Sequence, residues 1–385
     1  MDEARAKAGL LRGRLPHSGR GRLLLTSAVV LVLAGTGLGT WAADTWPWPK
    51  ERYCWGAWEE DSGPGFLGDE AFGEDDEGSR TSEETAPTHE RPTGSCEIVI
   101  AADYTSGYDG DEVTSDERVT VEYGPLPEAA EPRFEKLRDG FLGGDVVPLP
   151  DGLPGTVNAH GGLLVLPESC DTEDGRPTVV TLRTSGVYTS GSSYTTDSPA
   201  DLGGARQAAV LLVEVANRGM AAAGCAPDEP LEVTSPLLDL PGAEESFIGS
   251  EEDVCGVRGL YLGMERLEYR IGAFTRDLQT CSVRSDKDGT PYLDLAAVAQ
   301  PRLAAVFDGV TGQRPVARGW RGTGSLGKEY AVVRAECAGR TVVLTANGVS
   351  TDLRHLAAFA DAAAARLGCA PIAPSDASDP EGADR

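Results

Sequence analysis

The pattern of apolar and polar positions begins with one long uncharged run. Residues 23–43 contain no charged side chain, and Arg22 and Asp44 stand at the two ends of the run. A helix of this length rises roughly 31 Å at about 1.5 Å per residue, which is close to the ~30 Å hydrocarbon core of a bilayer. The run therefore predicts a transmembrane helix over residues 23–43.

The flanks of this run predict its orientation. Residues 1–22 hold Arg5, Lys7, Arg12, Arg14, Arg20 and Arg22 against two acidic residues. An excess of Lys and Arg marks the cytoplasmic side of a membrane, and tryptophans such as Trp46 and Trp48 suit the outer interface. We expect a basic cytoplasmic stub over 1–22 and an extracytoplasmic remainder. The alternative is a signal peptide cleaved at the small-x-small motif Thr40-Trp41-Ala42, which makes the protein secreted.

After residue 44 the pattern changes to short strands and helices. Strand-like runs occupy 97–102 and 118–123, which form a hairpin, and also 162–167 and 177–183. Pro132 opens a short helix that ends at Arg138. A helix capped by Asp201 is apolar on most faces and stops at Gly224, so we expect it to be buried.

The second half of the chain repeats this order with shorter loops. Short strands flank a turn at Asp286–Gly289, and a helix is expected near 302–307. Further strands are predicted at 330–337 and 340–346. The last helix begins at Asp352 and carries an apolar stripe that ends at Leu367.

The cysteines show that this repeat covers most of the chain. The first copy holds Cys54, Cys96, Cys170 and Cys225, and the second holds Cys255, Cys281, Cys337 and Cys369. Both copies end in Gly-Cys-Ala-Pro. An inner stretch of the two copies also matches at identical spacing: Gly152, Gly155, Thr156 and Cys170 correspond to Gly319, Gly322, Thr323 and Cys337. The matches predict two related tandem domains.

These observations predict an α+β fold class: a transmembrane helix followed by two disulfide-stapled domains, each with a small antiparallel sheet and a C-terminal helix. The expected boundaries are 44–228 for the first extracytoplasmic domain, 229–250 for a linker, 251–372 for the second domain and 373–385 for a disordered tail. Within the first domain, residues 59–90 hold twelve acidic residues against Arg80 alone. Such a segment buries little apolar surface, so we expect a disordered loop there.

An even number of cysteines outside the membrane favours disulfides. The third cysteine of each copy follows a strand, and the fourth ends the helix that packs on that strand. We therefore expect the pairs Cys54–Cys96, Cys170–Cys225, Cys255–Cys281 and Cys337–Cys369. Zinc is the alternative use of cysteine, but the chain has no CxxC motif and only His17, His89, His160 and His355.

The charge is distributed unevenly along the chain. The net charge is −27; the first 43 residues carry +4, which leaves −31 for the rest. Nucleic acids and anionic lipid headgroups need basic patches on a partner, so neither is expected to bind the extracytoplasmic part. The bilayer around 23–43 and an envelope protein or cell-wall component remain as expected partners.

Two motifs resemble ligand-binding sites, but the residues around them do not fit such sites. Residues 322–328 read as GxxxxGK, but Glu329 and a strand follow instead of Ser or Thr and a helix, so no nucleotide is expected. Residues 286–289 resemble part of a Ca²⁺ loop, but Arg284 and Leu295 occupy its end positions. We predict no catalytic, cofactor-binding or metal-binding residue, because no nucleophile has a base near it in the sequence.

The basic stub, the Ala/Val/Leu/Gly anchor, Cys54-Trp55-Gly56, the two Gly-Cys-Ala-Pro ends and the Ala-rich last helix resemble single-pass membrane proteins of actinomycetes, of the Streptomyces type. The resemblance covers most of the chain. It implies an anchored extracytoplasmic protein, and it brings no catalytic residues or cofactor.

The sequence as a whole favours a non-enzymatic, membrane-tethered binding protein of the cell envelope. One alternative is an envelope hydrolase, which predicts a pocket holding clustered carboxylates or His160. The other is a sensor that passes a signal through residues 1–22 to a cytoplasmic partner.

Overall fold

The computed structural model describes residues 50–60, 65–72, 78–105, 112–138, 141–143, 145–190, 194–197, 200, 202–240, 253–262, 267–285, 291–348 and 353–375. Residues 51–385 form one compact unit. The predicted stub 1–22 and transmembrane segment 23–43 lie outside the described residues. In the part of the chain that is described, no helix is both long enough and apolar enough to cross a membrane.

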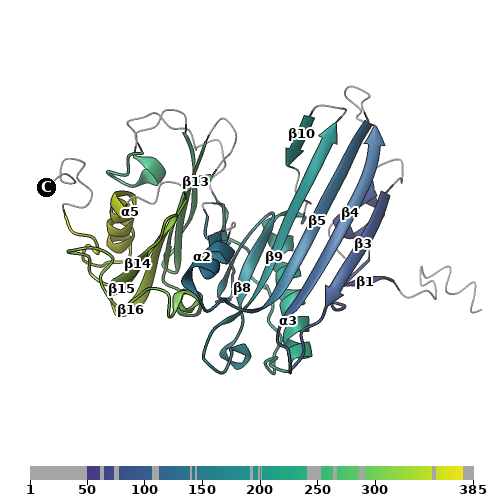
Figure 1. Cartoon of the computed structure of the whole chain (residues 1–385), viewed down its shortest axis with the longest axis horizontal. Coiled ribbons are helices and arrows are strands. Elements are labelled where there is room, and N and C mark those ends of the chain that lie inside the picture. Colours follow the sequence, from purple (N-terminus) through teal and green to yellow (C-terminus); the bar gives the residue numbers. More distant parts are fainter. Residues whose placement is uncertain are drawn as a thin grey trace, which may run out of the picture. The chain divides into compact units, whose positions relative to one another are not determined.

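The first half is built on an eight-stranded antiparallel sheet (Figure 1). Its strand order is β3-β4-β5-β9-β8-β7-β6, and β10 also pairs with β9. The strands are β3 (Gly78–Thr85), β4 (Gly94–Thr105), β5 (Glu112–Pro125), β6 (Val147–Pro148), β7 (Gly155–Asn158), β8 (Gly161–Val165), β9 (Thr178–Ser190) and β10 (Tyr194–Asp197). The predicted hairpin is confirmed, because all of β4 pairs with residues 112–123 of β5.

The second half is built on a six-stranded antiparallel sheet in the order β11-β12-β13-β16-β15-β14. Its strands are β11 (Leu267–Phe274), β12 (Leu278–Ser285), β13 (Pro291–Val298), β14 (Thr323–Leu326), β15 (Tyr330–Cys337) and β16 (Arg340–Asn347). The shorter elements of the unit are β1 (Arg52–Tyr53), β2 (Trp58–Glu59), η1 (Gly65–Leu67), η2 (Asp69–Phe72), η3 (Glu168–Cys170) and η5 (Val254–Gly256).

The two sheets have the same order of strands. Counting along the chain, β3-β4-β5-β9-β8-β7 corresponds to β11-β12-β13-β16-β15-β14. The first cysteine of each copy also has the same unusual backbone, since φ is 52° at Cys54 and 54° at Cys255. The matched Gly155 and Gly322 share a further property: a Cβ at either position would overlap a carbonyl oxygen of the adjacent strand.

Each sheet is covered on one face by the long helix that closes its half. Helix α3 (Gly204–Ala223) packs on the first sheet, and α5 (Leu353–Arg366) packs on the second. Gly224 ends α3 in the left-handed conformation with φ of 76°, as the sequence predicts. Helix α3 begins at Gly204, and the predicted cap Asp201 lies outside the described residues.

The other face of each sheet contributes to a core that both halves share. Two short helical segments lie in this core: α2 (Ala130–Arg138) in the first half, and α4 (Pro301–Ala304) continued by η6 (Ala305–Phe307) in the second. Buried residues of the shared core include Leu126, Phe134, Leu137, Leu163, Val165 and Val179 from the first half, with Leu278, Val298, Leu303, Phe307, Val332 and Val343 from the second. The two halves therefore bury apolar surface against each other.

All eight cysteines form disulfides: Cys54–Cys96, Cys170–Cys225, Cys255–Cys281 and Cys337–Cys369. These are the pairs that the sequence predicts. Each pair lies within one copy, so each half carries two covalent links of its own.

The expectation of disorder over 59–90 is wrong for most of this segment. Residues 78–85 form β3, which pairs with β4 from Gly78 to Thr85. Arg80 also anchors the segment, because its Nε donates to Phe66 O at 3.0 Å and its guanidinium lies 4.9 Å from the Phe72 ring centroid. Backbone pairing with an existing strand supplies the stability that side-chain burial does not. Residues 61–64 and 73–77 lie outside the described part.

Part of the expected linker 229–250 is described by the structure. Residues 229–240 form no helix or strand, and the side chains of Leu231, Val233 and Leu237 pack against the core of the first half. The side-chain amide of Asn217 donates to Leu231 O at 2.9 Å and accepts from Leu231 N at 3.0 Å. Ala373, the first residue of the expected tail, is buried in the second core. Residues 241–250 and 376–385 lie outside the described part.

Candidate functional site

The residues that the sequence singled out for possible chemistry lie on separate elements. His160 is exposed in the turn between β7 and β8, where its backbone N–H donates to Asn158 Oδ1 at 2.9 Å. His355 is in the first turn of α5, and His89 precedes β4. The turn 286–289 falls outside the described residues. Among described residues, no cluster of three or more His, Cys, Asp or Glu side chains is arranged to hold a metal ion.

The GxxxxGK segment leads into the strand that its context predicts, and it also contains a strand that was not predicted from the sequence. Thr323–Leu326 is strand β14, which pairs antiparallel with β15. The turn between these strands contains Lys328 and Glu329. No helix follows the lysine, so the phosphate-cradling geometry of a nucleotide loop is not formed here. The tip of this hairpin nevertheless contributes to a cavity between the two halves.

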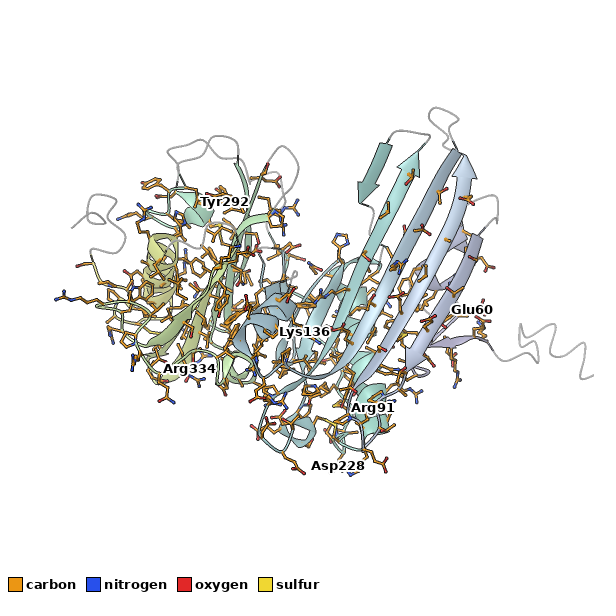
Figure 2. All side chains as sticks on the ribbon, in the orientation of Figure 1. Glu60, Arg91, Lys136, Asp228, Tyr292 and Arg334 are labelled. Atoms are coloured by element: carbon orange, nitrogen blue, oxygen red, sulfur yellow. A yellow bond between two sulfur atoms is a disulfide. The ribbon has the colours of Figure 1, made fainter. Side chains whose placement is uncertain are left out.

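This cavity has a volume of about 310 Å³ and takes its walls from both halves of the unit. Helix α2 of the first half supplies one wall, and the β14–β15 hairpin and the end of β16 supply the others. Lys136, labelled in Figure 2, follows Glu135 on α2 and shows where this helix lies. The lining residues are Glu131, Phe134, Glu135, Lys328, Glu329, Tyr330 and Asn347.

An aromatic stack fixes the helix against the sheet beside the cavity. The rings of Phe134 and Tyr330 are stacked with centroids 4.2 Å apart and an interplanar angle of 19°. On its other side, Phe134 approaches Phe307 with centroids 5.8 Å apart. Phe134 is buried, so α2 is held to both the sheet and η6 by one side chain. The cavity wall is therefore part of the shared core.

The floor of the cavity belongs to a polar row that crosses the second sheet. Ser282, Asp294, Asn347 and Tyr330 are directly opposite one another on β12, β13, β16 and β15. Opposite residues of antiparallel strands place their side chains on the same face. This face is the one that packs on the first half, so the row is enclosed between the halves.

Several polar atoms near this row have no hydrogen-bond partner among the described residues. They are Asn347 Oδ1 in the row itself, Thr280 and Thr345 Oγ1 in the adjacent row, and Asp145 Oδ1 from the first half. Each of these atoms is buried. Buried polar atoms are normally paired, so these four atoms are exceptions within the contact between the halves.

Asp294 and Asp145 bring two carboxylates into this region from opposite halves. Burial raises the pKa of Asp294, the hydrogen bond from Ser282 and the charge of Arg284 act to lower it, and the charge of Asp145 raises it. Asn158 Nδ2 donates to Asp145 Oδ2 at 3.0 Å and holds that carboxylate in place. The neighbourhood of the row is therefore electronegative and rich in acceptors.

The cavity offers charge, hydrogen-bond acceptors and aromatic rings. The described lining residues bring three carboxylates against one ammonium, and these residues include no histidine, cysteine or serine. Among the described residues of the lining, no nucleophile is paired with a base as acyl transfer requires. Clustered carboxylates in a pocket are the feature that the envelope-hydrolase alternative predicts, and carboxylates also hold polar or cationic ligand groups.

The fold and the site together define the class of protein: a disulfide-linked α+β unit of two antiparallel sheets with a shared core. Comparison of the chain with protein-family models, curated proteins and solved structures gave no match.

Neither the cavity nor its lining was part of the sequence prediction. The cavity exists because α2 packs against strands that lie almost two hundred positions later in the chain. Lys328 belongs to the segment that resembles a phosphate loop. In the structure it lies at the rim of a cavity lined by glutamates. Ser282, Asp294, Asn347 and Tyr330 are separated in the sequence. Only the register of the strands shows that they form one row.

Proposed function

We propose that the protein is a non-enzymatic, extracytoplasmic binding protein of the cell envelope, tethered to the membrane by residues 23–43. The disulfides support the compartment. All eight cysteines are paired, and such bonds persist in oxidising surroundings outside the cytoplasm. The apolar run 23–43 and the basic residues before it support the tether and its orientation.

The cavity between α2 and the β14–β15 hairpin carries the proposal that the protein binds a ligand. It is placed where the two halves meet, and its walls come from elements that the shared core and the stack of Phe134 on Tyr330 hold in place. A site held by rigid elements loses little conformational entropy when a partner binds. Recognition at this place uses both halves, which accounts for a tandem arrangement.

A membrane-topology experiment tests the compartment and the tether. Native membranes holding the full chain are extracted at alkaline pH, and thiols are probed with a maleimide before and after reduction. We expect retention in the membrane pellet, with thiols that react only after reduction. Release of a shortened soluble form indicates signal cleavage and refutes the tether. Thiols that react without reduction refute the extracytoplasmic disulfide-bonded state.

Site-specific photo-crosslinking tests the binding role. Glu135→p-benzoylphenylalanine places a crosslinker at the cavity wall, and Glu83→p-benzoylphenylalanine places one on the exposed strand β3 as a matched control. We expect an adduct with an envelope component at position 135 that is absent at position 83. Equal labelling at both positions, or none at either, contradicts the binding role of this cavity. An adduct that is cleaved during incubation supports the hydrolase alternative.

A further inference from the structure

Two carboxylates from opposite halves of the unit meet at the contact between the halves. Asp145 follows α2 in the first half, and Asp294 lies on β13 in the second. We propose that this pair is a proton-controlled contact, which holds the halves together when Asp294 is protonated and loosens when Asp294 ionises beside Asp145. The effect of this contact on ligand capture rests on the proposed binding function, whereas the contact itself does not.

Gly143 shows how closely the two carboxylates approach each other. This glycine is buried, and a Cβ atom at its position would lie 3.2 Å from Asp145 Oδ1, 3.6 Å from Asp294 Oδ1 and 3.0 Å from Ser282 Oγ. The two carboxylates and the hydroxyl therefore surround one point. Because glycine has no side chain, the backbone of the first half reaches the acidic group of the second.

Asp145 has a buried acceptor at this point that lacks a donor. Its Oδ1 has no hydrogen-bond partner among the described residues, while its Oδ2 accepts from Asn158 Nδ2 at 3.0 Å. Ser282 donates its hydroxyl to Asp294 Oδ1. A protonated Asp294 carries an O–H donor beside Asp145, whereas an ionised Asp294 has acceptors only. Loss of the proton therefore replaces a possible hydrogen bond with repulsion between two charges of the same sign.

The strands around Asp294 supply few charges that could offset this repulsion. Strand β12 contributes Arg284, whose charge acts on Asp294. On β11, Arg270 is directly opposite Ser282 in the row, but its Nε donates to Glu268 Oε1 at 3.3 Å. The residues that continue the row on β16 and β15 are an asparagine and a tyrosine, which are uncharged at neutral pH. Among the described residues, Arg284 is therefore the main positive charge near both aspartates.

The surroundings of Asp294 determine the sign of the pH dependence. Burial is the largest effect on its pKa and raises it, Ser282 and Arg284 act to lower it, and Asp145 raises it, so that the pKa lies above 3.8. When the halves separate, Asp294 loses both burial and the neighbouring Asp145. The docked state therefore binds the proton more tightly, and docking weakens as the pH rises through the raised pKa.

Short stretches of chain connect this contact to the cavity. In the first half, Phe141 and Leu142 lie between α2 and Asp145, and both are buried in the shared core. In the second half, Asn347 lies directly opposite Asp294 and belongs to the lining of the cavity. A looser contact would therefore let α2 move relative to β15 and β16, which changes the cavity walls. In this way the pH outside the cell would regulate ligand capture.

Hydroxyl-radical footprinting of the full chain in mild detergent, from pH 4 to pH 8, tests the contact. Phe134 and Phe307 report on the shared core, while Trp58 and Phe359 report on the separate cores of the two halves. All four side chains are buried. We expect oxidation of Phe134 and Phe307 to rise about threefold or more with pH, and oxidation of Trp58 and Phe359 to stay constant.

Two variants remove the repulsion without changing the shape of either side chain. Asp145→Asn turns one acceptor into an amide donor beside Asp294, and Asp294→Asn removes the group that titrates. We expect oxidation of Phe134 to remain low at every pH in both variants. Asp116→Asn, which changes an exposed carboxylate on β5, should retain the rise. A misfolded variant is recognised because Phe359 also becomes oxidised.

Three outcomes overturn the proposed contact. Constant oxidation of Phe134 in the wild type shows that the halves do not respond to pH. An equal rise at Phe359 shows general unfolding. A rise that persists in both Asp145→Asn and Asp294→Asn assigns the response to other groups.

The crosslinker at position 135 tests the connection to the cavity at both ends of the pH range. We expect the amount of captured partner to change with pH in the wild type and to stay constant in Asp145→Asn. Equal capture at both ends, with a footprint that changes, refutes the regulation of the cavity. If no partner is captured at either pH while the footprint changes, the binding function is wrong and the proton-controlled contact stands.

Discussion

Arg302 and Asp171 form an ion pair that joins the two halves of the unit. Arg302 Nη1 donates to Asp171 Oδ2 at 2.7 Å, and its Nε donates to Leu166 O at 2.9 Å. Arg133 occupies the equivalent place in the other copy, since each arginine follows a proline at the start of its short helix. Arg133 also crosses to the opposite half, where its Nη1 donates to Asp308 O at 2.6 Å. The two arginines thus make reciprocal contacts between the halves.

Replacement of Arg302 tests the first of these contacts. Arg302→Ala leaves Asp171 partly buried without its partner and Leu166 O without its donors. Breaking a buried pair from one side costs about 3 kcal/mol, so we expect the free energy of unfolding to fall by about that amount. Arg52→Ala, which breaks the exposed pair with Glu59, should cost less than about 1 kcal/mol. Urea denaturation measures the loss in each variant, and equal losses would show that the contact between the halves stabilises the fold no more than the exposed pair does.

Replacement of Arg133 tests the reciprocal contact. Arg133 is 2 % exposed, and its donors satisfy the carbonyl oxygens of Pro127, Val306 and Asp308. Arg133→Met keeps the apolar stem and removes every donor, so these carbonyls lose their partner. We expect a loss of about 3 kcal/mol in stability, measured by thermal unfolding. Arg133→Lys should recover only part of this loss, because one ammonium does not reach all three oxygens. Wild-type stability in either variant would contradict the assignment.

Asp294 predicts a pH dependence of stability. Its folded pKa is raised above the ordinary value of 3.8, mainly by burial, so the folded state holds its proton to higher pH than the unfolded chain does. The stability from this group is fully present below pH 3.8 and is lost as the pH rises through the raised folded pKa. Asp294→Asn removes the charge, so we expect a higher melting temperature at pH 7 and a weaker decline above pH 4.

The control for this prediction is Asp116→Asn, which changes an exposed carboxylate on β5. Melting temperatures of both variants and of the wild type are measured from pH 4 to pH 7. If the two substitutions change the melting temperature equally at every pH, the decline in stability with rising pH does not arise from Asp294.

The disulfides predict losses of similar size in the two halves. Cys170–Cys225 links residues 55 positions apart, and Cys255–Cys281 links residues 26 positions apart. In the chain-entropy description, removal of either costs roughly 3–4 kcal/mol, and the longer loop costs slightly more. Double Cys→Ser variants of each pair, unfolded in guanidinium, measure these losses. A variant as stable as the wild type would mean that its bridge is not formed in the native protein.

Local features of the sequence determined a large part of this protein. The repeated cysteines predict the four pairs, because each copy places a cysteine after a strand and another after the helix that packs on that strand. The glycines Gly224 and Gly368 predict where the long helices end, since few other residues adopt the left-handed conformation readily. The apolar runs 97–102 and 118–123 predict the β4–β5 hairpin.

Only the tertiary structure decided the rest, because the interactions concerned join distant residues and leave no local pattern. Strand β3 is polar and exposed, and its backbone bonds to β4 order a segment whose composition predicts disorder. The shared core places Phe134 against Tyr330, and that contact forms the cavity. The row from Ser282 to Tyr330 exists only through strand register. Composition and periodicity describe how a segment folds, whereas the docking of one half on the other sets which side chains meet.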